Sequence, residues 1–196
     1  MRNYFGGKMS FIRIIILTGV ILGGVILVWR IAPAKSRLQV LQSGPYFPVV
    51  SGFNLNRQEL EFPRDFEREL NLVIVPFQQV QQNTVNTWLP AVQEVEAAFP
   101  GFIYYEMPTI YEMPVFSRTF INEGMRAGIP NQTSRERTIT LYLDKNEFKS
   151  ALEIPNEEDI FLFLVNRDGE ILWRTTGAYT PEKTDELVKV IQAVRE

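Results

Sequence analysis

The chain has 196 residues, enough for one folded domain and a short additional segment. Its net charge of −3 gives no basic footprint of the kind that nucleic-acid-binding proteins carry. It contains neither cysteine nor histidine, which excludes thiol redox chemistry, cysteine or histidine nucleophiles, disulfides and most zinc sites.

The beginning of the chain is basic and then apolar. Residues 14–29, "IIILTGVILGGVILVW", carry no charge, and Arg13 and Arg30 lie at either side, where their side chains can reach the membrane interfaces. We therefore predict a basic flank over residues 1–13 and a transmembrane anchor over residues 14–31. The alternative is a cleaved secretory signal, because "APA" at 32–34 resembles a cleavage site. Basic residues are balanced on the two sides, so the positive-inside rule does not set the orientation.

A linker is predicted over residues 32–52, where prolines and glycines break any periodicity, and a folded domain over residues 53–196. Within the domain, Phe62–Leu70 is predicted to form a short helical turn. Residues 71–77, "NLVIVPF", form a continuous apolar run that is typical of a strand buried on both faces. A helix capped by Asn83 or Thr84 is expected to follow.

That helix is expected to continue to Phe99, because its apolar residues recur at helical spacing, and Pro90 is expected to kink it. Residues 102–108 are predicted as the next strand. A further helix is predicted from about Ser117 to Gly128, and one of its faces is apolar: Phe116, Phe120, Ile121 and Met125.

The remaining segments predict an extra strand, a hairpin and a last helix. Residues 138–143 alternate between apolar and polar and precede a short helix. Strands at 159–165 and 170–177 are joined by "NRDG", a strong hairpin signal. Thr180 and Pro181 suit the cap and the first position of a closing helix. The order predicts an α/β domain with a central mixed sheet and helices on both faces.

This order resembles that of the thioredoxin-like superfamily, whose membrane-anchored members read F-W-A-x-W-C-x-x-C-x-x-E-x-P after a strand. In this chain, Phe77 takes the place of the aromatic residue and Pro90 that of the proline. Gln82 and Val85 take the places of the two redox cysteines, and Trp88 that of the glutamate. The resemblance implies the fold without the thiol chemistry. Pro155 departs from the family pattern, because "NEED" separates it from the hairpin strand that the family's cis-proline directly precedes.

A second resemblance is carried by "WLP", "EMPTI", "GMRAGIP" and "IFLFLVNRDGEILWRTTG". These stretches are similar to a mitochondrial ATP synthase assembly-factor family of thioredoxin-like fold. The resemblance implies a membrane-associated chaperone for a hydrophobic ATP synthase subunit that acts without redox chemistry.

We therefore expect a single-pass protein of a bacterial inner membrane or an organellar membrane that binds a protein partner and is not an enzyme. No cofactor, metal or nucleic acid is predicted. The candidate partner-binding residues are Gln79, Gln82, Val85 and Arg174. The alternative for the glutamine-rich turn is a solvated loop with no role in binding. The alternative functions are a permanent accessory subunit of a membrane complex and a glutathione-dependent redox-related enzyme.

Overall fold

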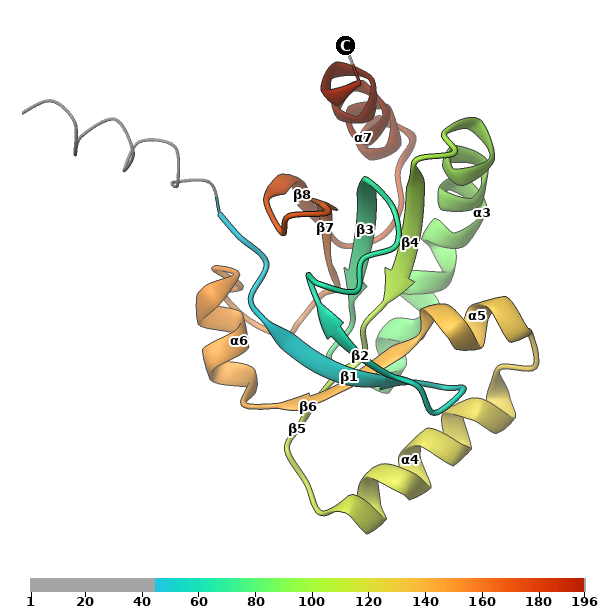
Figure 1. Ribbon diagram of the computed structural model, residues 1–196, viewed down its shortest axis with the longest axis vertical. Helices are drawn as coiled ribbons and strands as arrows, with labels where there is room; N and C mark the ends of the chain where they lie inside the picture. The colour runs from blue at the N-terminus through green and yellow to red at the C-terminus, as the bar shows by residue number, and fades with distance from the viewer. Residues whose placement is uncertain (1–44, 196) are drawn as a thin grey trace, which may run out of the picture. The chain divides into compact units, whose positions relative to one another are not determined.

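The computed structural model describes residues 45–195, which fold as one unit (Figure 1). The predicted basic flank, anchor and most of the predicted linker lie outside these residues. Within the described range, no helix has the length and apolar character needed to cross a membrane. The folded unit begins at Pro45, earlier than the predicted residue 53. The reason is packing: Phe47 is buried, and its ring meets those of Phe66, Phe148 and Phe163 edge-on.

One four-stranded sheet contains the strands predicted at residues 71–77, 102–108, 159–165 and 170–177. Its order is β4-β3-β7-β8. The central strand β3 (Leu70–Val75) is buried along its whole length, pairs in parallel with β4 (Phe102–Glu106) and pairs antiparallel with β7 (Phe161–Asn166). The edge strand β8 (Ile171–Thr176) closes the predicted hairpin, with Gly169 at a φ of +92° in its turn.

A second four-stranded sheet was not predicted. Its order is β2-β1-β6-β5, formed by β2 (Glu59–Phe62), β1 (Val50–Asn54), β6 (Ile139–Leu143) and β5 (Thr109–Tyr111). The chain switches sheets between β4 and β5, at Met107 and Pro108. The Met107 amide still donates to Ile74 of β3, whereas the Pro108 carbonyl accepts from Leu141 of β6. Pro108 has no amide hydrogen with which to continue the first ladder, so the expectation of one central sheet is corrected to two.

Two helices cover one face of the first sheet. Helix α3 (Gln82–Ala98) and helix α7 (Pro181–Val194) pack on the side that carries Leu72 and Ile74. The side that carries Val73 and Val75 packs against the second sheet and α6 (Lys145–Ala151). Because alternate residues of a strand point to opposite faces, β3 contributes to both cores. The prediction of helices on both faces is therefore replaced, on one side, by a sheet with one short helix.

The other helices lie beside the second sheet. They are α4 (Val115–Gly128) and α5 (Gln132–Arg137), and Figure 1 shows α4 lying outside both sheets. The predicted helical turn at Phe62–Leu70 is confined to one hydrogen-bonded turn after β2, in which the Asp65 amide donates to Glu61 and the Phe66 amide to Pro63. Phe66 and Leu70 are buried, and the chain then enters β3. The predicted caps of α7 are confirmed: Thr180 accepts a hydrogen bond from the Lys183 amide, and Pro181 starts the helix.

Candidate functional site

The turn between β3 and α3 lies where thioredoxin-like proteins keep their reactive groups. It consists of Pro76, Phe77 and Gln78, followed by the single 3-10 turn η2 (Gln79–Gln81) that leads into α3. The helix begins at Gln82, so the predicted caps Asn83 and Thr84 lie inside its first turn. The conformation of the turn is set by glutamine side chains.

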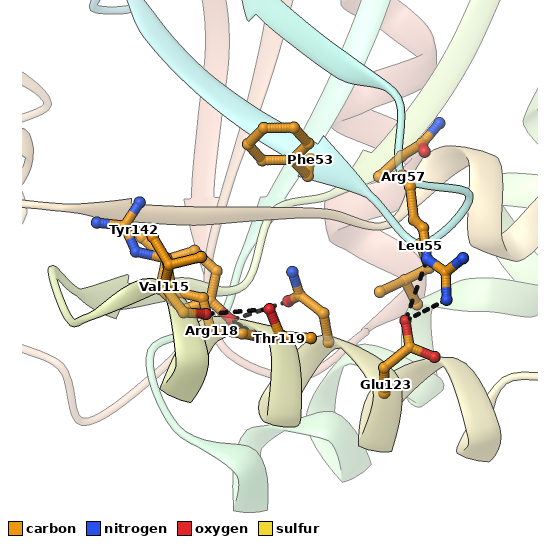
Figure 2. A pocket seen from close by; sticks show the side chains of 10 residues that line it. Phe53, Leu55, Arg57, Val115, Arg118, Thr119, Glu123 and Tyr142 are labelled. Carbon is orange, nitrogen blue, oxygen red and sulfur yellow. Dashed lines mark hydrogen bonds and ion pairs between the residues drawn. The ribbon is translucent and has the colours of Figure 1, made fainter.

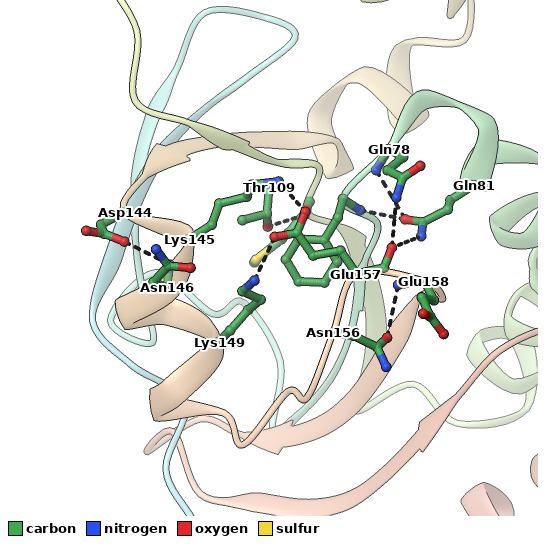
Figure 3. Close-up of polar contacts among 12 residues, drawn as sticks. Gln78, Gln81, Thr109, Asp144, Lys145, Asn146, Lys149, Asn156, Glu157 and Glu158 are labelled. Atoms are coloured by element: carbon green, nitrogen blue, oxygen red, sulfur yellow. Dashed lines mark hydrogen bonds and ion pairs between the residues drawn. The ribbon is translucent and has the colours of Figure 1, made fainter.

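Gln81 is the central residue of this turn, and it is buried. Its Oε1 accepts hydrogen bonds from the amides of Phe77 at 2.7 Å and Gln78 at 3.2 Å. Its Nε2 donates to the carbonyl oxygen of Glu157 at 2.9 Å, and Gln78 Nε2 donates to the same oxygen at 3.0 Å. Figure 3 shows these bonds converging on the loop before β7. A neutral amide that both accepts and donates fits this position, because it satisfies backbone groups of both kinds.

The side chain of Glu157 ties the same loop to α6. It forms ion pairs with Lys145 and with Lys149, the latter at 2.8 Å (Figure 3). Partial burial acts to raise the pKa of the Glu157 carboxyl, but the hydrogen bonds and charges of the two lysines outweigh it, so the pKa lies below its ordinary value. The buried Lys145 ammonium also lies 4.3 Å from the centre of the Tyr111 ring and 5.6 Å from that of Phe77. The cluster links the turn, β5 and α6.

Gln82 faces the end of β4. Its Nε2 donates to Asn86 at 3.1 Å and to the carboxylate of Glu106 at 3.2 Å. Glu106 is buried, and this burial raises the pKa of its carboxyl, although the bond from Gln82 opposes the rise. Gln82 thus occupies a redox-cysteine position with a side chain that is used within the fold.

The structure separates the four predicted contact residues. Gln79 is exposed on the turn, and Gln82 is half-buried beside it. Val85 is fully buried against the first sheet, so it is a core residue and not a surface contact. It falls on the inward stripe of α3, three residues before Trp88.

The fourth residue, Arg174, lies on β8. Its guanidinium donates to the Leu152 carbonyl at 2.9 Å, pairs with Glu153 at 3.4 Å and lies 5.4 Å from the centre of the Phe163 ring. These contacts tie Arg174 to the end of α6, apart from the glutamines of the turn.

Three residues that organise the site were not predicted: Glu106, Lys145 and Glu157. Glu106 could have been found as an acid at the end of an apolar strand. The Lys145–Glu157 pair carries no periodic signal, since it joins the first residue of α6 to a residue 12 positions later, in the irregular loop that follows the helix. Among residues 45–195, no cluster of acidic side chains is arranged to hold a metal ion. Pro155 lies in the same loop as Glu157, and its peptide bond is trans, whereas the Phe62–Pro63 bond is cis.

The turn has the position of a thioredoxin-like reactive turn and contains neither cysteine nor histidine. Its glutamine amides are used in holding the turn, the helix start and the neighbouring loop together. The groups that remain for a partner are at the tip, where Val80 is 67% exposed next to Gln79. Val80 was missed because its single apolar side chain in a polar stretch gives no periodic pattern.

Comparison with known proteins identifies a family and a fold. Residues 34–194 match the sequence model of the family described as ATP10 protein. The comparison with curated protein sequences gave no match.

Solved structures share the fold. Copper-bound ScoI from Arabidopsis thaliana has a TM-score of 0.52 at 11% identity, covering 76% of this chain and 99% of its own. A protein from Aquifex aeolicus VF5 proposed to transfer electrons also has a TM-score of 0.52, at 10% identity, covering 75% and 90%. A thiol:disulfide interchange protein from a Bacteroides species has 0.48 at 19% identity, covering 67% and 79%. The two structures with a TM-score of 0.52 establish a thioredoxin-like α/β fold.

Proposed function

We propose that this chain, which belongs to the ATP10 protein family, is a membrane-anchored, non-enzymatic protein that binds a partner during assembly of ATP synthase. The family supplies the assembly role. The anchor is proposed from the apolar run at residues 14–31, and with it a location in a bacterial inner membrane or an organellar membrane.

One observation carries the non-enzymatic part of the proposal. In thioredoxin-like enzymes a cysteine at the start of the helix is activated as a thiolate. Here the corresponding positions are Gln82, which is bonded to Glu106, and Val85, which is buried. A turn of this kind keeps its shape and offers its tip, Gln79 and Val80, for binding.

The role in assembly is tested by deleting the gene and separating membrane complexes on native gels. The expected result is that ATP synthase subunits are synthesised but accumulate outside the complete enzyme. Normal amounts of complete enzyme in the deletion strain would overturn the proposal. Stoichiometric recovery of the chain in the purified mature enzyme would instead identify a permanent accessory subunit.

The contribution of the turn is tested by complementing the deletion with variants. Val80→Asp places a charge on the exposed tip, so it is expected to lower the yield of complete ATP synthase without changing the stability of the domain. The matched control is Gln93→Asp, at an exposed position of α3, the helix that follows the turn. Equal complementation by both variants would exclude the tip as the partner contact.

The alternative of a glutathione-dependent enzyme is tested by titrating glutathione and following amide resonances by NMR. No change is expected near Gln82 or Pro155. Saturable shifts at both positions would support the enzyme instead.

A further inference from the structure

In helix α4 the polar face points toward the protein and the apolar face points away from it, which is the reverse of an ordinary helix of a globular domain. Its polar side chains Arg118, Thr119 and Asn122 face the second sheet across a cleft of about 350 Å³ (Figure 2). On that side, Tyr142 donates a hydrogen bond to Asn122 at 2.8 Å, and Arg57 pairs with Glu123 at 2.8 Å. Figure 2 shows Thr119 and Glu123 pointing from the helix toward the strands, with Arg57 reaching Glu123 from the turn after β1. Polar contacts therefore hold α4 in place.

The outward face of α4 is apolar and uncharged. Phe116 is 87% exposed and Phe120 is 78% exposed. These two residues and Gly124 follow one another at a spacing of four, which places them on one side of the helix. A shallow hollow on this side is lined only by residues from the helix and its approach: Met113, Phe116, Ser117, Phe120 and Ile121. No residue of α4 is buried.

We propose that this outward face of α4 lies on the surface of an anionic lipid bilayer. An amphipathic helix with bulky aromatic residues on one face and an arginine in its last turn is suited to the boundary between headgroups and acyl chains. Because α4 lies outside both sheets, a flat surface can approach it along its length (Figure 1).

The charge distribution favours anionic lipid. Residues 45–196 contain 14 basic and 23 acidic residues, so the domain as a whole is acidic. The segment 113–137, which contains α4 and α5, has the opposite balance, with four arginines and two glutamates. Arg118 faces the second sheet and pairs with Glu112. Arg137 pairs with Glu96. Arg126 on α4 and Arg135 on α5 form no ion pair within residues 45–195, so these two arginines are the ones available to headgroups. A local excess of arginine beside an apolar face complements negatively charged headgroups and strengthens binding at moderate salt.

The chain outside the structure brings the domain within reach of a bilayer. If the predicted anchor ends at residue 31, thirteen residues separate it from Pro45, and they span at most about 45 Å. A domain of the length of residues 45–196 has a radius of gyration of about 15 Å. The linker is therefore long enough for any face of the domain to meet the membrane. This contact goes beyond partner binding and rests on the proposed function only for the presence of the anchor.

The test uses the absence of cysteine, which makes a single introduced thiol the only labelling site. Gly124→Cys places a label on the outward face, where an added Cβ meets no atom within 4 Å. Gly101→Cys, in the loop between α3 and β4, is the matched control, because an added Cβ is equally free there. The full chain with a polarity-sensitive fluorophore is reconstituted into vesicles of neutral lipid or of neutral lipid mixed with phosphatidylglycerol, and flotation verifies incorporation.

With phosphatidylglycerol present, the label at position 124 is expected to shift its emission to the blue. Nitroxides on the lipid chains should quench it several-fold more than the label at position 101. High salt or purely neutral lipid should reduce this difference. Adding Phe116→Ser and Phe120→Ser to Gly124→Cys should abolish it while the circular dichroism spectrum is unchanged, since both rings are exposed.

Equal quenching at positions 124 and 101 in anionic vesicles would overturn the inference. So would a label at position 124 that remains in water in both kinds of vesicle and becomes protected only when the ATP synthase membrane sector is reconstituted with it. That second result would assign the face to a protein. The measurement needs no assembly activity, so its failure leaves the test of the proposed function independent.

Discussion

Helices α3 and α4 have similar lengths and comparable apolar stripes, yet the fold uses them in opposite ways. In α3 the stripe of Val85, Trp88 and Val92 is buried against the first sheet. In α4 the stripe of Phe116 and Phe120 is in solvent, and the polar side faces the protein. Apolar periodicity therefore identifies a face that seeks an apolar environment and does not say whether that environment is the protein's own core.

Removing the largest side chain of α3 should have the greatest effect. Trp88 is fully buried, meets Tyr179 edge-on, and its Nε1 donates to the Gly177 carbonyl at 2.9 Å. Trp88→Ala is expected to lower the free energy of unfolding by about 3–5 kcal/mol, because it leaves a cavity and an unpaired carbonyl. Urea denaturation measures this, with the exposed Gln93→Ala as control. A loss as small as that of the control would contradict the packing described for α3.

The start of α3 should depend on Gln81. Replacing it as Gln81→Met keeps a similar volume but leaves the amides of Phe77 and Gln78 without their acceptor, so we expect a loss of about 1–3 kcal/mol in the free energy of unfolding. Gln79→Met, at an exposed position of the same turn, should change it by no more than about 0.5 kcal/mol. Equal stability of the two variants would show that the glutamine bonds do not hold the turn.

Glu106, which accepts a hydrogen bond from the first residue of α3, should make the free energy of unfolding depend on pH. Because burial raises its folded pKa, the folded chain binds more protons than the unfolded chain above the ordinary glutamate pKa of about 4.3. The stabilising contribution of Glu106 to the free energy of unfolding is therefore fully present below that pH and is lost as the pH rises through the folded pKa. Glu106→Gln cannot ionise and should therefore be more stable than the wild type at pH 8, with little difference at pH 4.

The measurement for Glu106 is urea denaturation across this pH range. Glu94→Gln, which alters an exposed carboxylate of α3, is the control and should follow the wild-type curve in shape. A stability difference between Glu106→Gln and wild type that is constant with pH would contradict the assignment.

The attachment of α4 should be weaker than that of α3. Tyr142→Phe removes the hydroxyl that donates to Asn122 and should lower the free energy of unfolding by about 0.5–1 kcal/mol. Hydrogen exchange should become faster in the amides of α4 while those of α3 keep their protection. Equal acceleration in both helices would mean that the two are not separately held.

The smallest effect is expected on the outward face of α4. Phe120→Ser removes an aromatic ring that is already 78% exposed, so the free energy of unfolding should change by no more than about 0.5 kcal/mol. Thermal denaturation of the domain checks this, with Trp88→Ala as the opposite extreme. A large loss would show that the ring packs within the fold and would remove the contrast between the two helices.

Sequence patterns were sufficient for much of the fold. The buried strand, the hairpin at Asp168-Gly169 and the capped closing helix all follow from short-range rules of periodicity and turn chemistry. The second sheet did not follow, because β5 has three residues and β6 finds its partners far along the chain. Strand pairing is a long-range choice that short apolar runs do not encode.

The candidate site divides in the same way. The sequence by itself determined that the turn lacks a nucleophile, because residue types are sufficient to exclude thiol chemistry. Only the tertiary structure decided that Val85 belongs to the core, that Gln81 binds the Glu157 carbonyl and that Lys145 pairs with the same residue's carboxylate. It also decided that the apolar stripe of α4 faces outward. Each of these depends on which surfaces meet in three dimensions, and helical or strand periodicity carries no information about the partner of a face.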